Sequence, residues 1–132
     1  MKALVVDDSR AIRVILTKML QELGYQVAEA RHGREALLYL QSHADTAIAL
    51  VDWNMPEMNG YELVQAVRAD GALAGVKLMM VTTEIEMSQM MKALEAGAHE
   101  YVMKPFTKAV IEDKLRLLGL PTSHGAAAWA GS

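Results

Sequence analysis

Residues 47–60 read AIALVDWNMPEMNG, and the fold of the whole chain can be worked out from this stretch. Its first five residues form an unbroken apolar run, which is typical of a β-strand that is buried on both faces. Pro56 and the pair Asn59 and Gly60 then indicate a turn. Asp52 therefore lies at the carboxyl end of a predicted buried strand, where an ionised carboxylate has to be paired, bound to a metal or reactive.

Short apolar runs alternate with helical patterns five times along the chain. The expected strands span residues 3–6, 26–29, 47–51, 77–81 and 101–103, and each is followed by apolar residues at the three- and four-residue spacing of a helix. This alternation predicts the α/β class, with a parallel sheet that is covered by helices on both faces and joined by right-handed crossovers.

Two of the predicted helices have apolar faces that we expect to pack into the core. The first face consists of Ile12, Ile15, Leu16, Met19, Leu20 and Leu23, and the fourth helix contributes Met87, Met90, Met91 and Leu94. Because methionine adapts to irregular surfaces, the fourth face has a second interpretation as a surface for a partner.

Composition limits the function classes that need to be considered. The 132 residues are 52% hydrophobic, which is enough for one packed domain, and the formal net charge of -3 argues against a nucleic acid or an anionic membrane as partner. There is no cysteine, so disulfides and thiol catalysis are excluded. No apolar stretch reaches 18 residues, and we expect a soluble, cytoplasmic protein.

The domain should comprise residues 1–119, followed by a flexible tail at residues 120–132 that has no hydrophobic period.

Polar side chains follow four of the five predicted strands. Asp7 and Asp8 follow the first strand, Asp52 the third, Thr82 the fourth and Lys104 the fifth. Because the carboxyl ends of parallel strands meet at one edge of a sheet, these side chains are expected to converge. Two like charges about 4 Å apart repel by roughly 4 kcal/mol at an effective dielectric constant near 20, so three acids need a cation, a proton or both. Oxygen ligands alone favour Mg²⁺, with Mn²⁺ as a substitute.

This set of groups suits a phosphoryl ligand. A metal ion, the Lys104 ammonium and the Thr82 hydroxyl are all partners for phosphoryl oxygens. An ionised carboxylate can accept a phosphoryl group without a general base, which makes Asp52 a candidate nucleophile. Taken singly, Asp7 and Asp8 are more often a helix cap and Lys104 a solvated turn residue. Their joint order along five alternating units indicates a site.

In these residues the chain resembles the receiver domains of two-component response regulators, and in particular the single-domain chemotaxis regulators of the CheY type. The matching motifs are the pair Asp7 and Asp8, DWNMPEMNG around Asp52, TTE at residues 82–84 and YVMKPF at residues 101–106. The similarity extends from residue 2 to about residue 118. It implies a doubly wound, flavodoxin-like (βα)5 fold with five parallel strands in the order 2-1-3-4-5.

The resemblance also implies roles for the site residues. Asp52 would be the phosphoacceptor, and Thr82 and Lys104 would contact the phosphoryl oxygens. Asp8, Asp52 and the backbone carbonyl of Asn54 would bind Mg²⁺, with Asp7 acting through water. The Lys104–Pro105 peptide bond would be cis.

A switch and a control of phosphoryl lifetime follow from the same resemblance. After phosphorylation the Thr82 hydroxyl would move toward the phosphoryl group and Tyr101 would turn inward, which reshapes the face formed by the fourth helix, the fifth strand and the fifth helix. Asn54, Thr83 and Glu84 would set access to the phosphoryl group and its lifetime. Thr83 occupies a position where many relatives have a smaller residue.

The expected function is therefore a phosphoaspartate receiver module in a chemotaxis phosphorelay, which catalyses only its own phosphorylation and dephosphorylation. Its partners would be a histidine kinase or phosphotransfer protein and an output target protein. We expect a monomer, with a dimer as the alternative. Two other functions are kept. One is a Mg²⁺-dependent phosphatase of the haloacid dehalogenase class, although Trp53, Asn54 and Met55 do not fit its DxDx[TV] motif; the other is a stand-alone structural adaptor.

Overall fold

In the computed structural model we describe residues 1–83 and 87–122, without the side chain of Met87. Five parallel strands form one sheet in the order β2-β1-β3-β4-β5, which confirms the expected topology. The strands are β1 (Lys2–Val6), β2 (Gln26–Ala30), β3 (Ile48–Val51), β4 (Lys77–Thr82) and β5 (Glu100–Met103).

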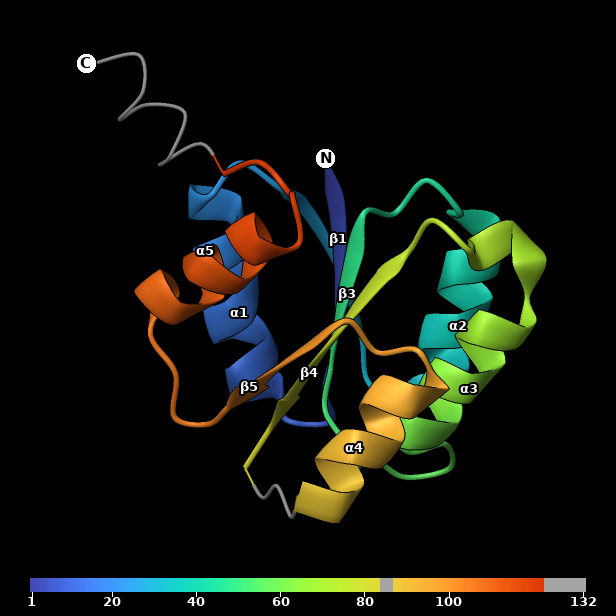
Figure 1. Cartoon of the computed structure of the whole chain (residues 1–132). Helices are drawn as coiled ribbons and strands as arrows, with labels where there is room; N and C mark the ends of the chain where they lie inside the picture. Colours follow the sequence, from blue (N-terminus) through green and yellow to red (C-terminus); the bar gives the residue numbers. More distant parts are fainter. Residues whose placement is uncertain (84–86, 123–132) are drawn as a thin grey trace.

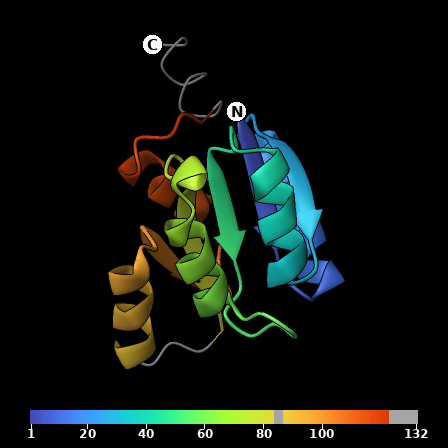
Figure 2. The same cartoon turned by 90° about the vertical axis from the view of Figure 1, so that its right-hand side faces the viewer.

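Helices cover both faces of this sheet, as the alternation predicted (Figure 1). On one face lie α1 (Arg10–Glu22) and α5 (Lys108–Leu117). On the other lie α2 (Gly33–Ser42), α3 (Gly60–Ala69) and α4 (Met87–Ala96), which face the reader in Figure 2. A short 3-10 helix, η1 (Gly71–Leu73), follows α3 and was not expected from the sequence. Within the described residues, no helix is long and apolar enough to span a membrane.

Polar side chains set the points at which the helices begin. Ser9 accepts a hydrogen bond from the N–H of Ile12 at the start of α1, and Thr107 accepts one from the N–H of Val110 at the start of α5. Each bond satisfies a backbone donor that has no partner inside the helix. The helices that follow β1 and β5 therefore start a few residues after the strand ends, beside the edge where the acids lie.

The central strand β3 contributes to two separate hydrophobic clusters. Ile48 and Leu50 pack with residues of α1 and α5, whereas Ala49 and Val51 pack with residues of α2 and α3. All four side chains are completely buried, which confirms a strand covered on both faces. Successive residues point to opposite faces, so each cluster receives every second side chain of the strand.

The expectation that the first and fourth helical faces lie in the core was wrong for three residues. Ile15 of α1 is 44% exposed, and Met91 and Leu94 of α4 are 52% and 40% exposed. In α4 the buried anchor is Ala93, because the helix lies near the edge of the sheet and has no further strand beneath its outer side. The side chain of Met87 lies outside the description.

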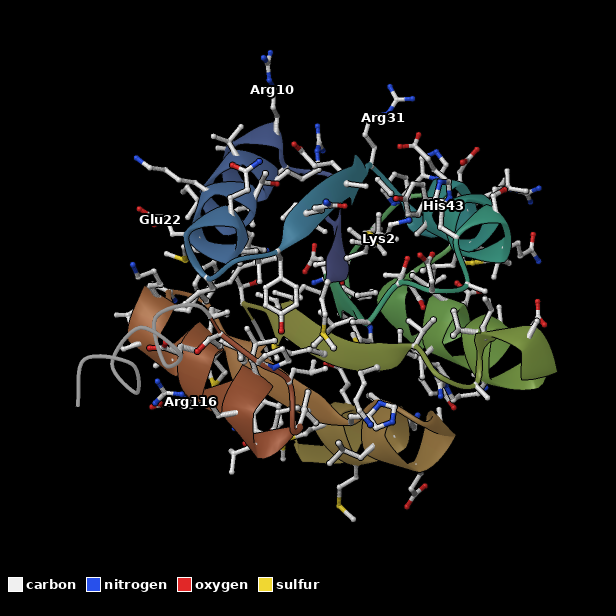
Figure 3. The ribbon with its side chains drawn as sticks, turned by 90° about the horizontal axis from the view of Figure 1, so that it is seen from above. Lys2, Arg10, Glu22, Arg31, His43 and Arg116 are labelled. Atoms are coloured by element: carbon white, nitrogen blue, oxygen red, sulfur yellow. The ribbon has the colours of Figure 1, made fainter. Side chains whose placement is uncertain are left out.

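Residue 1 and the last described residues, 120–122, lie at the amino end of the sheet, opposite the carboxyl ends of the strands (Figure 1). Residues 120–122, which the sequence assigned to the tail, contact the domain. Leu120 packs against the α1–α5 cluster, and the carbonyl of Pro121 accepts a hydrogen bond from the Tyr25 hydroxyl at 2.7 Å. The view onto this end shows charged side chains of both signs, including Lys2, Glu22 and Arg116 (Figure 3).

Candidate functional site

Backbone hydrogen bonds continue past the ends of β1 and β3 and set the spacing of two acids. The N–H of Asp52 donates to the carbonyl of Val6 at 2.9 Å, and the N–H of Asp7 donates to the carbonyl of Ala30 at 3.2 Å. The parallel pairing therefore extends one residue beyond each strand. It holds Asp7 and Asp52 side by side at the carboxyl edge.

Three carboxylates meet at this edge, as the sequence predicted. One side-chain oxygen from each of Asp7, Asp8 and Asp52 lies within 4.8 Å of the others. Asp7 and Asp52 are buried, with 1% and 7% exposure, whereas Asp8 is exposed. The cluster is therefore buried on one side and open to solvent on the other.

Lys104 places an ammonium group beside the acids. Its Nζ lies 2.8 Å from Asp7 Oδ2 and 3.6 Å from Asp52 Oδ1, and the side chain is only 11% exposed. The N–H of Lys104 donates to the carbonyl of Thr82 at 2.8 Å, so this residue extends the β4–β5 pairing. The Lys104–Pro105 peptide bond is cis, as expected. Lys104 therefore forms a close ion pair with Asp7 and a longer one with Asp52, so it balances the charge of Asp52 less completely.

The ionisation of Asp52 reflects this arrangement. Burial raises the pKa of Asp52 to about 6, the Asp7 carboxylate adds to the rise, Lys104 acts in the opposite direction, and Asp8 contributes a further increase. At neutral pH most Asp52 side chains are still ionised, so three carboxylates face one ammonium. A site with oxygen donors only and excess negative charge fits a hard divalent cation such as Mg²⁺.

Thr82 contributes a buried hydroxyl group to this edge. It is the last residue of β4, one position later than the strand end expected from the sequence, and it is 2% exposed. Its Oγ1 has no hydrogen-bond partner among the described residues. A buried hydroxyl without a partner costs roughly 1–3 kcal/mol, so a ligand that supplied an acceptor here would gain a strong contact. Thr83 is exposed next to it, and Glu84 lies outside the described residues.

The loop after Asp52 folds back over the end of β3. The N–H of Gly60 donates to the carbonyl of Trp53 at 2.9 Å, and a Cβ atom at Gly60 would collide with the backbone carbonyl of Asp52. Asn54, the expected carbonyl ligand, lies in this loop and is exposed. Sequence reasoning treated Gly60 only as a turn residue, but this glycine permits the close approach that positions Asp52. Its place directly after Asn59, the cap of α3, was the only signal.

Arg13 is a second residue that sequence reasoning missed. Its guanidinium donates to the backbone carbonyl of Asp7 at 2.7 Å and pairs with Glu29 of β2 at 3.2 Å. It therefore ties α1 and β2 to the acidic turn. The sequence offers only a weak signal for this contact, namely that Arg13 is four residues after the cap Ser9.

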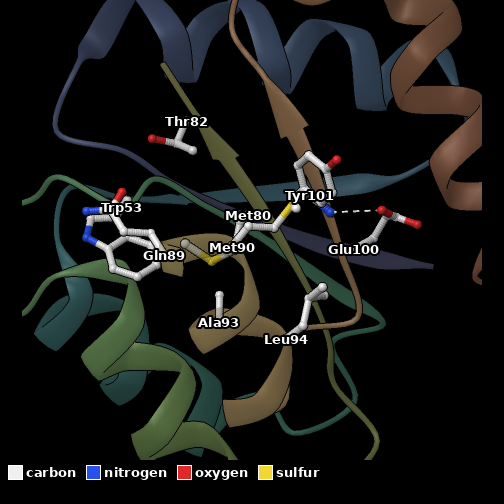
Figure 4. Close-up of a pocket in the computed structure, with 9 residues that line it drawn as sticks. All are labelled: Trp53, Met80, Thr82, Gln89, Met90, Ala93, Leu94, Glu100 and Tyr101. Atoms are coloured by element: carbon white, nitrogen blue, oxygen red, sulfur yellow. Dashed lines mark hydrogen bonds between the residues drawn. The ribbon is translucent and has the colours of Figure 1, made fainter. Parts of the chain in front are cut away.

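A small cavity lies between β4, β5 and α4 (Figure 4). Trp53, Thr82, Met90 and Tyr101 are among the residues that line it, with Trp53 and Tyr101 on opposite sides in this view. The centre of a water-sized sphere can occupy only about 10 Å³ of it, which is room for about one water. Tyr101 is half-buried, and Lys114 Nζ lies 5.3 Å from the centroid of its ring. The sequence-predicted switch residues thus border the same cavity.

Exposed apolar side chains occur on α4, β5 and α5, the three elements next to or containing Tyr101. Met91 and Leu94 come from α4, Met103 from β5 with 52% exposure, and Val110 from α5 with 40% exposure. We call these residues and Tyr101 the α4–β5–α5 face. Large apolar side chains that remain exposed on neighbouring elements are candidates for contact with a protein partner.

Comparisons with known proteins agree with this architecture. A family model described as the response regulator receiver domain matches residues 3–116. The chain is 47% identical to chemotaxis protein CheY1 of Helicobacter pylori over 119 residues, which cover 89% of this chain and 96% of that protein. It is 46% identical to the chemotaxis protein CheY homolog of Campylobacter jejuni over 129 residues, covering 96% and 99%. Among solved structures, chemotaxis protein CheY4 of Vibrio cholerae has a TM-score of 0.81 and 36% identity, covering 87% of this chain and 95% of that one.

Proposed function

This chain belongs to the response regulator receiver domain family, among chemotaxis regulators of the CheY type, and on this premise we propose that Asp52 accepts a phosphoryl group and thereby controls the binding of a target protein. One observation supports this role above all others. Three carboxylates with oxygens within 4.8 Å of one another share an edge with an ammonium that is 3.6 Å from Asp52 Oδ1.

The transfer needs no proton to be removed from the nucleophile. One carboxylate oxygen of Asp52 attacks phosphorus, the bond from phosphorus to the leaving group of the donor breaks, and the electron pair leaves with that group. Lys104 and the Thr82 hydroxyl then contact the phosphoryl oxygens. Because this hydroxyl is buried without a partner in the described residues, the phosphoryl group supplies the acceptor that it lacks.

The donor set of the cluster fits Mg²⁺. Asp8, Asp52 and the backbone carbonyl of Asn54 would hold the ion, and Asp7 would act through water. When it is bound, Mg²⁺ neutralises negative charge on the transferring group and on the acids. Without it, the repulsion from Asp7 and Asp8, which adds to the rise that burial causes in the pKa of Asp52, would also oppose the approach of an anionic donor.

Asn54, Thr83 and Glu84 limit access to the phosphoryl group and set its lifetime. Asn54 and Thr83 are exposed, and they follow Asp52 by two residues and Thr82 by one, which supports a role in the approach of a donor or an attacking water. Glu84 is assigned the same role from its sequence position. The donor is a histidine kinase or phosphotransfer protein, and the chain works as a monomer.

The switch connects Thr82 to the α4–β5–α5 face. Movement of the Thr82 hydroxyl toward the phosphoryl group enlarges the small cavity that it shares with Tyr101, and the Tyr101 ring turns inward to fill it. The ring then leaves its position beside Lys114, and the apolar surface around Met91 and Met103 changes shape. This two-state element is biased by the new charge-assisted hydrogen bonds, and one of its states binds the target.

Intact mass tests the phosphoacceptor. After incubation with Mg²⁺ and acetyl phosphate, the wild type should gain one alkali-labile phosphoryl group, and Asp52→Asn should gain none. Asp113→Asn removes an exposed carboxylate on α5 and should be labelled like the wild type. Equal labelling of Asp52→Asn would reject Asp52 as the acceptor. Release of many phosphates per chain from phosphoesters would instead support the phosphatase.

Hydrogen exchange tests the switch. Beryllium fluoride with Mg²⁺ mimics a phosphoryl group, and it should change amide exchange in α4 and β5 of the wild type but not of Asp52→Asn. Tyr101→Ala should keep the phosphorylation of Asp52 and lose the change in β5. Unchanged exchange across α4 and β5 in the wild type, with the phosphoryl mimic bound, would support a structural adaptor.

A further inference from the structure

An apolar groove opens beside the carboxylate cluster, on the side of α1. It is lined by Ile12 and Ile15 of α1 and by Thr83, Lys104, Pro105 and Phe106, which follow β4 and β5. The centre of a water-sized sphere can occupy about 310 Å³ of it. This size is at the lower end of the range for small-molecule sites, and four of the six lining residues are apolar.

The groove is continuous with the proposed phosphoryl site. Lys104 belongs to both, because it lines the groove while its Nζ lies 3.6 Å from Asp52 Oδ1. Thr83 lines the groove and follows Thr82 directly. A ligand that spans this boundary would have an anionic phosphoryl group at the Lys104 end and an apolar body along α1.

The walls of the groove are held in place by the core. Ile12 and Phe106 are half-buried and pack against the hydrophobic cluster between the sheet and the α1–α5 layer. Ile15 is different, because it is 44% exposed although its sequence position predicted burial. The apolar face of α1 is thus wider than the core beneath it needs, and Ile15 provides the solvent-facing wall.

We propose that this groove binds the apolar acyl group of a small acyl phosphate, and that Ile15 selects branched acyl phosphates over acetyl phosphate as phosphodonors. The proposal rests on the phosphoacceptor role of Asp52. In the transfer, the bond between phosphorus and the acyl oxygen breaks and a bond from phosphorus to an Asp52 carboxylate oxygen forms. The electron pair leaves with the acyl group, which departs as a carboxylate, and no proton or further reactant is required.

The test compares isovaleryl phosphate with acetyl phosphate, whose leaving carboxylates have similar basicity. The second-order rate constant for labelling of the wild type is measured with each donor by intact mass in the presence of Mg²⁺ and corrected for hydrolysis of the donor. A fully buried methylene is worth about fourfold in affinity, and partial burial of three added carbons in an open groove should give about a tenfold preference for isovaleryl phosphate.

Two variants on the same helix distinguish the effect of the groove on donor preference from the general effect of a substitution in α1. Ile15→Ala should lower the isovaleryl-to-acetyl ratio from about tenfold to about twofold, since it removes one wall. Val14→Ala changes a neighbouring exposed residue, 53% accessible, that does not line the groove, and it should keep the wild-type ratio.

Equal rate constants for the two donors in the wild type would overturn the proposal, and this is the result expected if only a protein donor uses the groove. The same loss of preference in Val14→Ala would also overturn it. These results leave the phosphoacceptor role intact, because Asp52 is still labelled. Failure of both donors to label the wild type would overturn the phosphoacceptor role together with the groove.

Discussion

Two buried hydroxyl groups lie at opposite ends of the sheet and have opposite surroundings. At the amino end, Tyr25 is 5% exposed and its hydroxyl donates to the carbonyl of Pro121 at 2.7 Å. At the carboxyl end, Thr82 is 2% exposed and its hydroxyl has no partner among the described residues. The buried hydroxyl at the first end is satisfied within the fold, whereas the one at the second end has no described partner and is where the proposed phosphoryl group would bind.

Buried carboxylates differ in the same way between the two regions. Glu112 of α5 is 7% exposed and accepts a hydrogen bond from Thr122 at 3.1 Å, with Arg116 also 3.3 Å away. Asp52 has the same 7% exposure, but its neighbours include two further acids, and its pKa is raised to about 6. We infer that the close acids and the unsatisfied hydroxyl at the carboxyl end lower the free energy of unfolding. The proposed metal ion and phosphoryl group would interact with these same groups. Four predictions test this difference, in order of decreasing effect.

The largest effect is expected for Gly60→Ala, because the added methyl group collides with the backbone of Asp52. Displacing that strand end should lower the free energy of unfolding by about 3 kcal/mol, as overpacking of a close contact does. The matched control is Gly71→Ala in η1, where a Cβ meets nothing within 4 Å. Urea denaturation measures both variants. A stable Gly60→Ala protein with normal labelling of Asp52 would show that the site tolerates backbone movement.

Asp52→Asn should make the metal-free protein more stable at neutral pH. The pKa of Asp52 is raised from its ordinary value of 3.8 to about 6, so the protonated carboxyl group favours the folded state. This contribution to the free energy of unfolding is complete below pH 3.8 and is lost as the pH rises through 6. Removing the charge should therefore add about 2 kcal/mol to the free energy of unfolding at pH 7.5 in EDTA, and much less at pH 4. An unchanged difference between these pH values would contradict the electrostatic explanation.

Substitutions of the two hydroxyl groups should have opposite signs. Tyr25→Phe should lower the free energy of unfolding by about 1.5 kcal/mol, because it leaves the Pro121 carbonyl without its donor. Thr82→Val removes a hydroxyl that has no described partner and should raise the free energy of unfolding by up to about 1 kcal/mol. Chemical denaturation without metal compares the two. A destabilised Thr82→Val would mean that this hydroxyl is already satisfied in the resting protein.

The smallest effect concerns His99 near the amino end, whose Nδ1 accepts a hydrogen bond from the N–H of Leu78 at 3.1 Å. Burial, with the charges of Arg68 and Lys77, lowers the pKa of His99 below its ordinary value of 6.5. The fold favours the neutral ring, and this preference adds to the free energy of unfolding above pH 6.5. The contribution is lost as the pH falls through the lowered pKa. His99→Gln keeps an acceptor that does not titrate. Relative to this variant, the wild type should lose stability on acidification, which thermal unfolding from pH 7.5 to pH 5 can measure.

Much of the site could be predicted because it depends on the ends of strands. The apolar run before Asp52 identified a buried strand, and parallel strands always bring their carboxyl ends to one edge. The convergence of Asp7, Asp8 and Lys104 on Asp52 follows from this rule alone. The roles of these residues in phosphoryl transfer stay predictions until Asp52 has been labelled.

Other features could not be predicted, because they depend on contacts between segments far apart in the sequence. The exposure of Ile15, Met91 and Leu94 depends on where the core ends beneath each helix, and hydrophobic periodicity contains no information on that boundary. The contact of Gly60 with the Asp52 backbone arises only when the loop folds back over β3.

The sequence by itself determined the order of strands and helices and the edge at which the acids gather, since alternation and chain direction are local properties. Only the tertiary structure decided which polar groups would be satisfied. Tyr25 meets Pro121 across 96 positions of the chain, whereas the Thr82 hydroxyl meets no partner among the residues described. Burial and hydrogen bonding are properties of the packed neighbourhood, and that neighbourhood exists only once distant segments have come together.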